Sequence, residues 1–190
     1  MIVELTVPQI GFNDEELYKL CMANPDLPIE RDELGRIIIM PPTGFESSYY
    51  NSDLLTDVNI WNRKNKLGRV TDSNGGYTLP DTSMRAPDVA WISNERISQT
   101  TPEDQKRFIH ACPDFVIELL SESDYLIELQ EKMNKYIKNG VRLGWLIDKK
   151  NKQVHIYRPS QEPVIQSFST KLSGEDVLVG FELDLTQIFQ

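Results

Sequence analysis

The sequence predicts a mixed α/β fold in a single domain, residues 1–190, with a central mixed β-sheet flanked by helices. A chain of 190 residues is long enough for one compact domain with its own core, and it shows no internal repeat or long linker. Two short apolar runs, at residues 88–92 and 115–120, have the length and composition of buried strands. Helical patterns precede the first run and follow the second, which favours helices packed against a sheet.

The N-terminal part, residues 1–34, is expected to hold a helix and the start of a hairpin. Asn13 stands three residues before Glu16, which is the capping-box signature of a helix start. The segment PIERDELGRIIIM, residues 28–40, predicts two strands joined by a turn at DELG.

A long helix is expected next, over residues 43–68, ended by Gly68. Its apolar positions recur at helical spacing: Tyr50, Leu54, Val58 and Trp61. We then expect short strands at residues 69–72, 76–79 and 88–92, and after a polar loop the strand 115–120.

The last part of the chain is expected to begin with a helix over residues 125–139, with Gly140 just past its end. A hairpin with its turn at KKNK should follow, formed by residues 142–148 and 153–159. The tail, residues 162–190, predicts a strand or two and a short terminal helix.

Composition points to a cytoplasmic protein without a membrane partner. The mean hydropathy is −0.40, and no apolar run approaches the roughly 20 residues of a membrane span. The N-terminus lacks the pattern of a signal peptide. Cys21 and Cys112 have no metal-binding spacing and are interpreted as reduced thiols. The two histidines, His110 and His155, are too few for a histidine-rich metal site.

The net charge of −9 argues against a surface broadly adapted to nucleic acid, because phosphate neutralisation needs Lys and Arg. Two basic segments stand out, RKNKLGR at residues 63–69 and the stretch 132–152. Ordinary solvated faces would explain both. If nucleic acid binds, its contact should be local, with residues 63–69 and the turn 149–152 as candidates.

Two acidic residues occupy unusual positions. Glu118 lies inside FVIELL, and burying a lone carboxylate costs several kcal/mol unless a partner compensates for it. Asp88 follows Pro87 at the start of DVAWI, where a plain turn aspartate is the simpler interpretation. For Glu118 the structural alternative is a buried ion pair with Arg or Lys.

Glu46 and Lys132 complete the set of candidates. Glu46 lies near the start of the long helix, where Thr43 and Glu46 could form a capping box, but it could equally point into a site. Lys132 lies at the margin of the apolar face of its helix, so it could extend to solvent or reach Glu118. Carboxylates that converge repel one another, and a Mg²⁺ ion, which prefers oxygen ligands, would remove that conflict.

A helix glutamate, a Pro-Asp pair and an in-strand glutamate together resemble the site of the PD-(D/E)XK nucleases. More closely, the chain resembles the Uma-two family of restriction endonucleases, also called domain of unknown function eight-twenty, from about Phe12 to the C-terminus. The resemblance rests on MPPTGFES, APDVAWIS, PDFVIELLSESD, EKMNKYIKNGVRLGWLID and VHIYRP, in this order and spacing.

The resemblance implies a restriction-endonuclease-like core over residues 46–158 that acts on DNA, with Mg²⁺ as cofactor and Mn²⁺ as a possible substitute. It implies catalytic roles for Glu46, Asp88, Glu118 and Lys132, with the metal on Asp88 and Glu118. It also favours a homodimer, because two strands need two sites. Two positions depart from the pattern: Leu120 stands where the motif has lysine, so Lys132 is the expected substitute, and Ser47 replaces the usual histidine.

Three functional hypotheses follow. The first is a Mg²⁺-dependent endonuclease that hydrolyses DNA phosphodiester bonds. The second is a catalytically silent module on the same fold that binds nucleic acid or protein. The third is a small-molecule-binding α/β protein in which Glu118 and Lys132 form an ion pair without metal, and metal titration separates it from the first.

Overall fold

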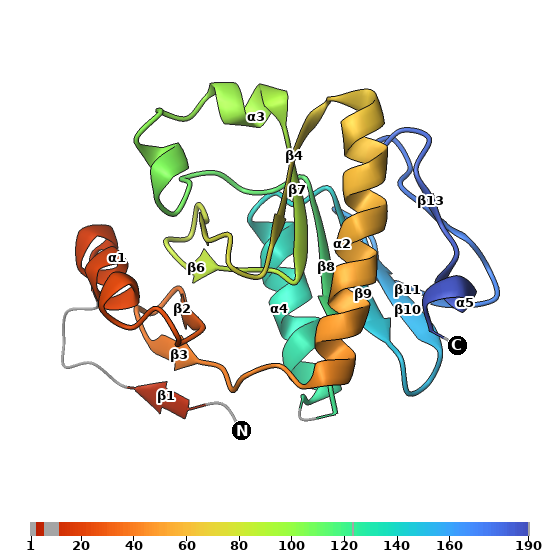
Figure 1. Ribbon diagram of the computed structural model, residues 1–190, viewed down its shortest axis with the longest axis horizontal. Helices are drawn as coiled ribbons and strands as arrows, with labels where there is room; N and C mark the ends of the chain where they lie inside the picture. The colour runs from red at the N-terminus through yellow and green to blue at the C-terminus, as the bar shows by residue number, and fades with distance from the viewer. Residues whose placement is uncertain (1–2, 6–11, 123, 190) are drawn as a thin grey trace.

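The computed structural model describes residues 3–5, 12–122 and 124–189 (Figure 1). Parts of the expected 1–190 domain, and Ser123 of the SESD motif, lie outside these residues. The centre is a six-stranded sheet in the order β11-β10-β9-β8-β7-β4. Its strands are β4 (Gly68–Asp72), β7 (Val89–Ser93), β8 (Phe115–Leu119), β9 (Leu143–Asp148), β10 (Gln153–Tyr157) and β11 (Val164–Ser167).

The sheet is mixed, as expected from the sequence. Strands β8 and β9 run parallel, whereas β4–β7, β7–β8, β9–β10 and β10–β11 are antiparallel. The parallel pair requires a crossover, which is supplied by α4 (Leu126–Lys138). The expected fold class, a central mixed sheet flanked by helices, is confirmed.

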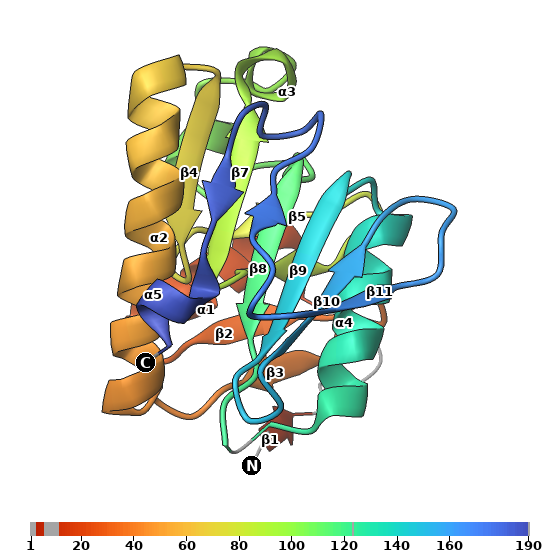
Figure 2. The same cartoon turned by 90° about the vertical axis from the view of Figure 1, so that its right-hand side faces the viewer.

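Helices α2 (Phe45–Asn65) and α4 cover opposite faces of the sheet (Figure 2). Leu54 and Val58 of α2 share one apolar cluster with Ile117 of β8. On the other side, Met133 of α4 packs with Val116. Because side chains alternate along a strand, Glu118 points to the same face as Val116, toward α4.

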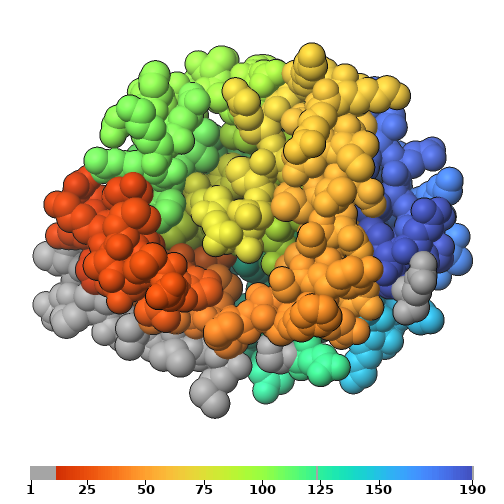
Figure 3. Space-filling view, viewed as in Figure 1, coloured from red at the N-terminus to blue at the C-terminus, as the bar shows by residue number. Residues whose placement is uncertain are grey.

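A smaller layer, not anticipated from the sequence, lies beside the N-terminal end of α2 and adjoins the central sheet. It is a five-stranded sheet in the order β1-β3-β2-β6-β5, with α1 packed on it. In Figure 3 the N-terminal helix and hairpin (red to orange) lie next to the β5–β6 segment (yellow) and α2. Its elements are β1 (Val3–Leu5), α1 (Asp14–Ala23), β2 (Ile29–Arg31), β3 (Ile37–Ile39), β5 (Tyr77–Thr78) and β6 (Met84–Arg85).

Two local predictions for this layer are confirmed. The capping box between Asn13 and Glu16 is present at the start of α1. Strands β2 and β3 form the predicted antiparallel hairpin, with Ile29 opposite Ile39.

The ends of α2 differ from the prediction. Its N-cap is Gly44, with no side-chain cap, so Thr43 and Glu46 form no capping box. At its C-terminal end Lys66 adopts a left-handed conformation with φ 57°, two residues before the expected Gly68. Gly68 instead opens β4, where a Cβ would lie 2.1 Å from the backbone oxygen of Ile92. Close packing of the strand, rather than helix termination, therefore requires this glycine.

The remaining elements are short. The polar loop after β7 contains α3 (Asn94–Ser98) and a 3-10 turn, η1 (Asp104–Lys106), which the sequence did not predict. After β11 the tail forms β12 (Leu172–Ser173), β13 (Glu182–Leu183) and α5 (Leu185–Ile188), so it holds the expected short helix but three strands instead of one or two. Within residues 3–5, 12–122 and 124–189, no helix combines the length and the apolar character needed to cross a membrane.

Candidate active site

The register of β7 and β8 brings two acidic residues together. Val89 of β7 pairs with Ile117 of β8, so Asp88, one residue before β7, lies next to Glu118 at the end of this ladder. The two carboxylates are close enough for the charge of Asp88 to raise the pKa of Glu118. Asp88 is held from the α2 side of the sheet by Asn51, whereas Glu118 is held from the α4 side by Tyr136 and Lys132. Pro87 and Asp88 therefore do more than form a turn, because they set a carboxylate beside the buried glutamate.

Asp88 is held by two hydrogen bonds. Its Oδ2 accepts from the backbone N–H of Leu119 at 2.8 Å, and its Oδ1 accepts from Nδ2 of Asn51 at 2.9 Å. Burial raises the pKa of Asp88, and the bond from Leu119 opposes this rise. The carboxylate is thus fixed in place but incompletely compensated in its charged form.

Glu118 is 5% exposed and has two partners on α4. Its Oε1 accepts a hydrogen bond from the hydroxyl of Tyr136 at 2.9 Å and lies 2.9 Å from Nζ of Lys132. Lys132 therefore reaches back to the strand, as one of the two sequence alternatives proposed. The ion pair that the metal-free alternative requires is also present.

The charges around Glu118 are not balanced by Lys132 alone. Burial raises the pKa of Glu118 to about 7, Lys132 opposes the rise, and the charges of Asp88 and Glu30 add to it. For Lys132, burial would lower the pKa, but the carboxylates of Glu118 and Glu30 outweigh burial and raise it. Lys132 accordingly stays an ammonium ion at neutral pH and acts as a donor rather than as a base.

Glu30, in β2, is a member of this cluster that sequence reasoning missed. It is 2% exposed, and its Oε1 lies 3.1 Å from Nζ of Lys132. Arg85 donates to its Oε2 at 2.9 Å. The signal that could have revealed it is a glutamate directly after Ile29 in a strand that is buried along its whole length.

Glu46 is not joined to the other three predicted residues by any contact within the described part of the chain. Instead it forms an ion pair with Lys149, and the hydroxyl of Tyr50 donates to its Oε1 at 3.5 Å. The α2 residue that reaches Asp88 is Asn51, which the sequence analysis also missed. The Oδ1 atom of Asn51 is buried and has no hydrogen-bond partner among the described residues.

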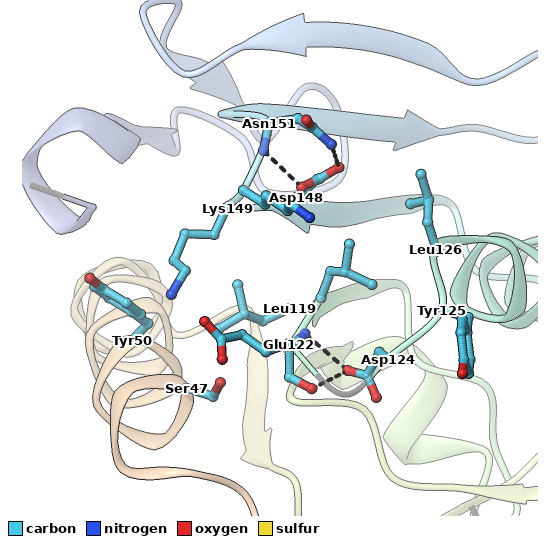
Figure 4. Close-up of a pocket in the computed structure, with 13 residues that line it drawn as sticks. Ser47, Tyr50, Leu119, Glu122, Asp124, Tyr125, Leu126, Asp148, Lys149 and Asn151 are labelled. Carbon is cyan, nitrogen blue, oxygen red and sulfur yellow. Dashed lines mark hydrogen bonds between the residues drawn. The ribbon is translucent and has the colours of Figure 1, made fainter. Parts of the chain in front are cut away.

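A cavity of about 730 Å³ opens at the carboxyl ends of the parallel strands β8 and β9 (Figure 4). Leu119, whose N–H binds Asp88, is part of its lining. Figure 4 shows Ser47 and Tyr50 of α2 on one side and Tyr125 and Leu126 on the other. The other lining residues are Leu120, Ser121, Glu122, Asp124, Asp148, Lys149, Lys150 and Asn151.

The turn between β9 and β10 places two lysines at this cavity. The carboxylate of Asp148 is buried and accepts from the N–H of Asn151 at 3.0 Å and from its Nδ2 at 2.7 Å. These bonds fix the turn that carries Lys149 and Lys150. Nζ of Lys149 lies 5.4 Å from the centre of the Tyr50 ring.

The donor set at Asp88 and Glu118 fits a Mg²⁺ ion. Among the described residues, the hydrogen bond and the ion pair of Glu118 both go to Oε1, and each oxygen of Asp88 accepts one hydrogen bond, so lone pairs remain for an ion. Across the described ranges no group of three or more His, Cys, Asp or Glu side chains could hold a metal by itself. Mg²⁺ needs no such group, because it keeps several waters and commonly takes one or two protein carboxylates.

The chain thus combines a mixed sheet, two acids at neighbouring strand ends and a lysine from the crossover helix. The model of the Uma2 family, described as "Putative restriction endonuclease", matches residues 14–186. The chain therefore belongs to the Uma2 family, as its sequence motifs predicted.

A solved structure supports the same fold. It is described as a "putative nuclease belonging to DUF820" from Anabaena variabilis, and it superposes with a TM-score of 0.72 at 23% sequence identity. The similarity covers 85% of this chain and 89% of that one. No curated protein matches the sequence.

Proposed function

We propose that this protein is a Mg²⁺-dependent endonuclease that hydrolyses DNA phosphodiester bonds. One observation carries the proposal: Asp88 and Glu118 lie beside each other where β7 and β8 pair, with Nζ of Lys132 2.9 Å from Glu118. Two acids and an ammonium ion are the groups that metal-assisted phosphodiester hydrolysis needs. Membership of the Uma2 family points to the same chemistry.

Each residue has a distinct role in this proposal. Asp88 and Glu118 would hold the Mg²⁺ ion, which when bound stabilises negative charge on the phosphoryl oxygens. Lys132, as an ammonium ion, donates a hydrogen bond to a phosphate oxygen or to the attacking water. Tyr136 and Asn51 keep the carboxylates of Glu118 and Asp88 in place through their hydrogen bonds.

The DNA backbone would approach through the cavity beside β8 and β9. Lys149 and Lys150 are the basic residues that line it. Glu46 contacts Lys149, so we assign Glu46 to the substrate side of the site rather than to the metal. Cleavage of both strands would need two such sites, and we propose a homodimer, which sedimentation of the purified protein would test.

The experiment is a cleavage assay on plasmid DNA with Mg²⁺ or Mn²⁺, with EDTA as the negative control. We expect nicking or cleavage by the wild type. The activity should be lost in Asp88→Asn, Glu118→Gln and Lys132→Met, because these groups act as a unit. A matched control is Lys138→Met, on the exposed side of the same helix, and it should cleave like the wild type. Cleavage that survives Glu118→Gln would contradict the proposal.

A second candidate is a binding module that does not cleave. Two observations favour it. Ser47 lines the cavity at the position of the usual family histidine, and Glu46 forms an ion pair with Lys149. Retention of DNA by the wild type in Mg²⁺, without any cleavage and with unchanged binding by Glu118→Gln, would favour this candidate over the nuclease.

A further inference from the structure

Glu30 is a buried carboxylate that reaches the candidate site from a different layer of the molecule. It lies in β2 of the small N-terminal sheet, whereas Lys132 belongs to the helix between β8 and β9. Its Oε1 accepts from the backbone N–H of Ala86 at 3.0 Å, and its Oε2 accepts from Nη1 of Arg85 at 2.9 Å. These two bonds fix the carboxylate independently of Lys132.

The fixed carboxylate lies 3.1 Å from Nζ of Lys132. The same nitrogen lies 2.9 Å from Oε1 of Glu118, so the ammonium group is held between two carboxylates from two sheets. A lysine side chain is long and loses up to about 2 kcal/mol of rotamer freedom when it is ordered. Two acceptors on separate elements of the fold confine its Nζ more than a single partner would.

A role in folding alone is a poor explanation for Glu30. The hairpin is already attached to its surroundings by Arg31, which donates to backbone oxygens of Phe12 at 2.6 Å and Thr82 at 2.5 Å. Glu33 supplies a second bridge to α4, 2.7 Å from Lys135. The charge of Glu30 also helps to raise the pKa of Glu118. Burial would raise the pKa of Glu30 itself, but Lys132 and Arg85 outweigh burial and lower it, so Glu30 stays charged beside Lys132.

We infer that Glu30 is a positioning residue for the proposed nuclease reaction, holding Nζ of Lys132 at a fixed place beside Glu118 by a direct ion pair. This inference rests on the proposed function for its catalytic meaning. The ion pair itself is independent of that function. Without Glu30, Lys132 keeps its contact with Glu118 but swings about it, and the ammonium group is misplaced for the phosphate or water.

The test compares Glu30→Gln with Glu33→Gln. Glutamine keeps the size and the acceptor oxygen of Glu30 but removes the charge. Glu33→Gln is the control, because Glu33 lies two residues after β2 and binds α4 through Lys135 instead of Lys132, with only a longer contact, 3.8 Å, to Arg85. One readout is the ¹⁵N spectrum of lysine ammonium groups in metal-free protein, in which a rigid, slowly exchanging Nζ gives a signal. The signal of Lys132 is identified as the one that is absent from the spectrum of Lys132→Met.

The spectrum should show the Lys132 signal in the wild type and in Glu33→Gln, and lose or broaden it in Glu30→Gln. The second readout is steady-state cleavage. A misplaced catalytic group can cost about 100-fold, so kcat of Glu30→Gln should fall by about that factor while KM for DNA and the Kd for Mn²⁺ change less than about twofold. An unchanged Lys132 signal, or an unchanged kcat, overturns the inference.

The experiment also distinguishes a variant that does not fold from a wild type that does not cleave DNA. If Glu30→Gln does not fold, Glu30→Asp, which withdraws the carboxylate by one methylene, is measured with the same two expectations. If the wild type cleaves no DNA, the proposed function fails, and the ammonium spectrum still decides whether Glu30 holds Lys132.

Discussion

Asp88 binds the backbone of Leu119, the residue that follows Glu118, through a hydrogen bond of 2.8 Å to Oδ2. The start of β7 is thereby attached to the end of β8. Movement of either strand end would break a buried bond to a carboxylate, which contributes about 1.5–3 kcal/mol. The bond therefore fixes the carboxylate of Asp88 next to the end of β8 that carries Glu118.

Removal of the Asp88 side chain should destabilise the fold. Asp88→Ala leaves the N–H of Leu119 and Nδ2 of Asn51 without acceptors, at a cost of about 1–3 kcal/mol for each buried group. Asp88→Asn keeps an oxygen for Leu119, and the unpaired Oδ1 of Asn51 can turn to accept from the new amide. Thermal melts in EDTA should place the alanine variant at least about 3 °C below the asparagine variant. Equal melting temperatures would contradict these hydrogen bonds.

Metal should stabilise the folded protein. A cation that binds only the folded state adds RT ln(1 + [L]/Kd), about 2.7 kcal/mol at 100 times Kd. At roughly 2–4 °C per kcal/mol, saturating Mn²⁺ or Mg²⁺ should raise the melting temperature by about 5–10 °C. The rise should vanish in Glu118→Gln and persist in Glu131→Gln, an exposed neighbour of Lys132.

The same melts test the metal-free ion-pair hypothesis. That hypothesis expects no metal effect and a large loss of stability in Glu118→Gln. The loss of stability in Glu118→Gln should be smaller than that hypothesis expects, because Lys132 would still be paired with Glu30 at 3.1 Å. We therefore expect Glu118→Gln in EDTA to melt close to the wild type.

The pH dependence of stability should carry the signature of Glu118. Its pKa is raised from 4.5 to about 7, chiefly by burial. Between these values the folded protein retains a proton that the unfolded chain has released, so the contribution of Glu118 to the free energy of unfolding falls as pH rises. Denaturant unfolding in EDTA at pH 5 to 8 should show a more negative slope for the wild type than for Glu118→Gln. Identical slopes would contradict the raised pKa.

The pKa of Glu118 also predicts how metal affinity depends on pH. A carboxyl group must lose its proton to bind a cation. The affinity for Mn²⁺, measured by calorimetry, should therefore weaken, with a larger Kd, as pH falls through about 7. An affinity that is constant from pH 8 to pH 5.5 would exclude Glu118 as a ligand.

Substrate contact should be confined to one of the two basic segments. Lys149 and Lys150 line the cavity, whereas Arg63 lies at the other end of α2, about 25 Å along the helix from Glu46 at 1.5 Å per residue. Lys149→Gln with Lys150→Gln should reduce the slope of log K against log salt by about two. Arg63→Gln with Lys64→Gln is the control, and a larger effect there would move the interface to the far end of α2.

The middle strands β7 and β8 of the central sheet could be predicted from the sequence because they are apolar runs with turn residues before them. The inward direction of Glu118 followed from the same pattern, since all five residues of β8 are buried. The position of Lys132 at the margin of the apolar face of α4 left two possibilities, solvent or Glu118, and the structure shows the contact with Glu118. These features depend on local periodicity, which a single sequence displays.

The rest depends on contacts between distant segments. Thr43 and Glu46 have the spacing of a capping box, but Glu46 is bound by Lys149 from the β9–β10 turn. Asn51 looks like any polar residue of an exposed helix face until Asp88 is placed beside it. Glu30 was hidden for the same reason, because its partners come from three later positions in the chain: Arg85, Ala86 and Lys132.

The ion pair between Glu30 and Lys132 connects the small N-terminal sheet to α4, so it can form only when that sheet has packed in place. Strand β8, helix α4 and strand β9 are consecutive and can assemble as one unit. Lys132 obtains its second partner only when the distant hairpin docks. Proteins open in cooperative units of unequal stability. An opening that releases β2 would free Lys132 from Glu30 and leave its contact with Glu118, even where the six-stranded sheet stays paired. A fixed position of Lys132 therefore requires the N-terminal hairpin as well as the central sheet.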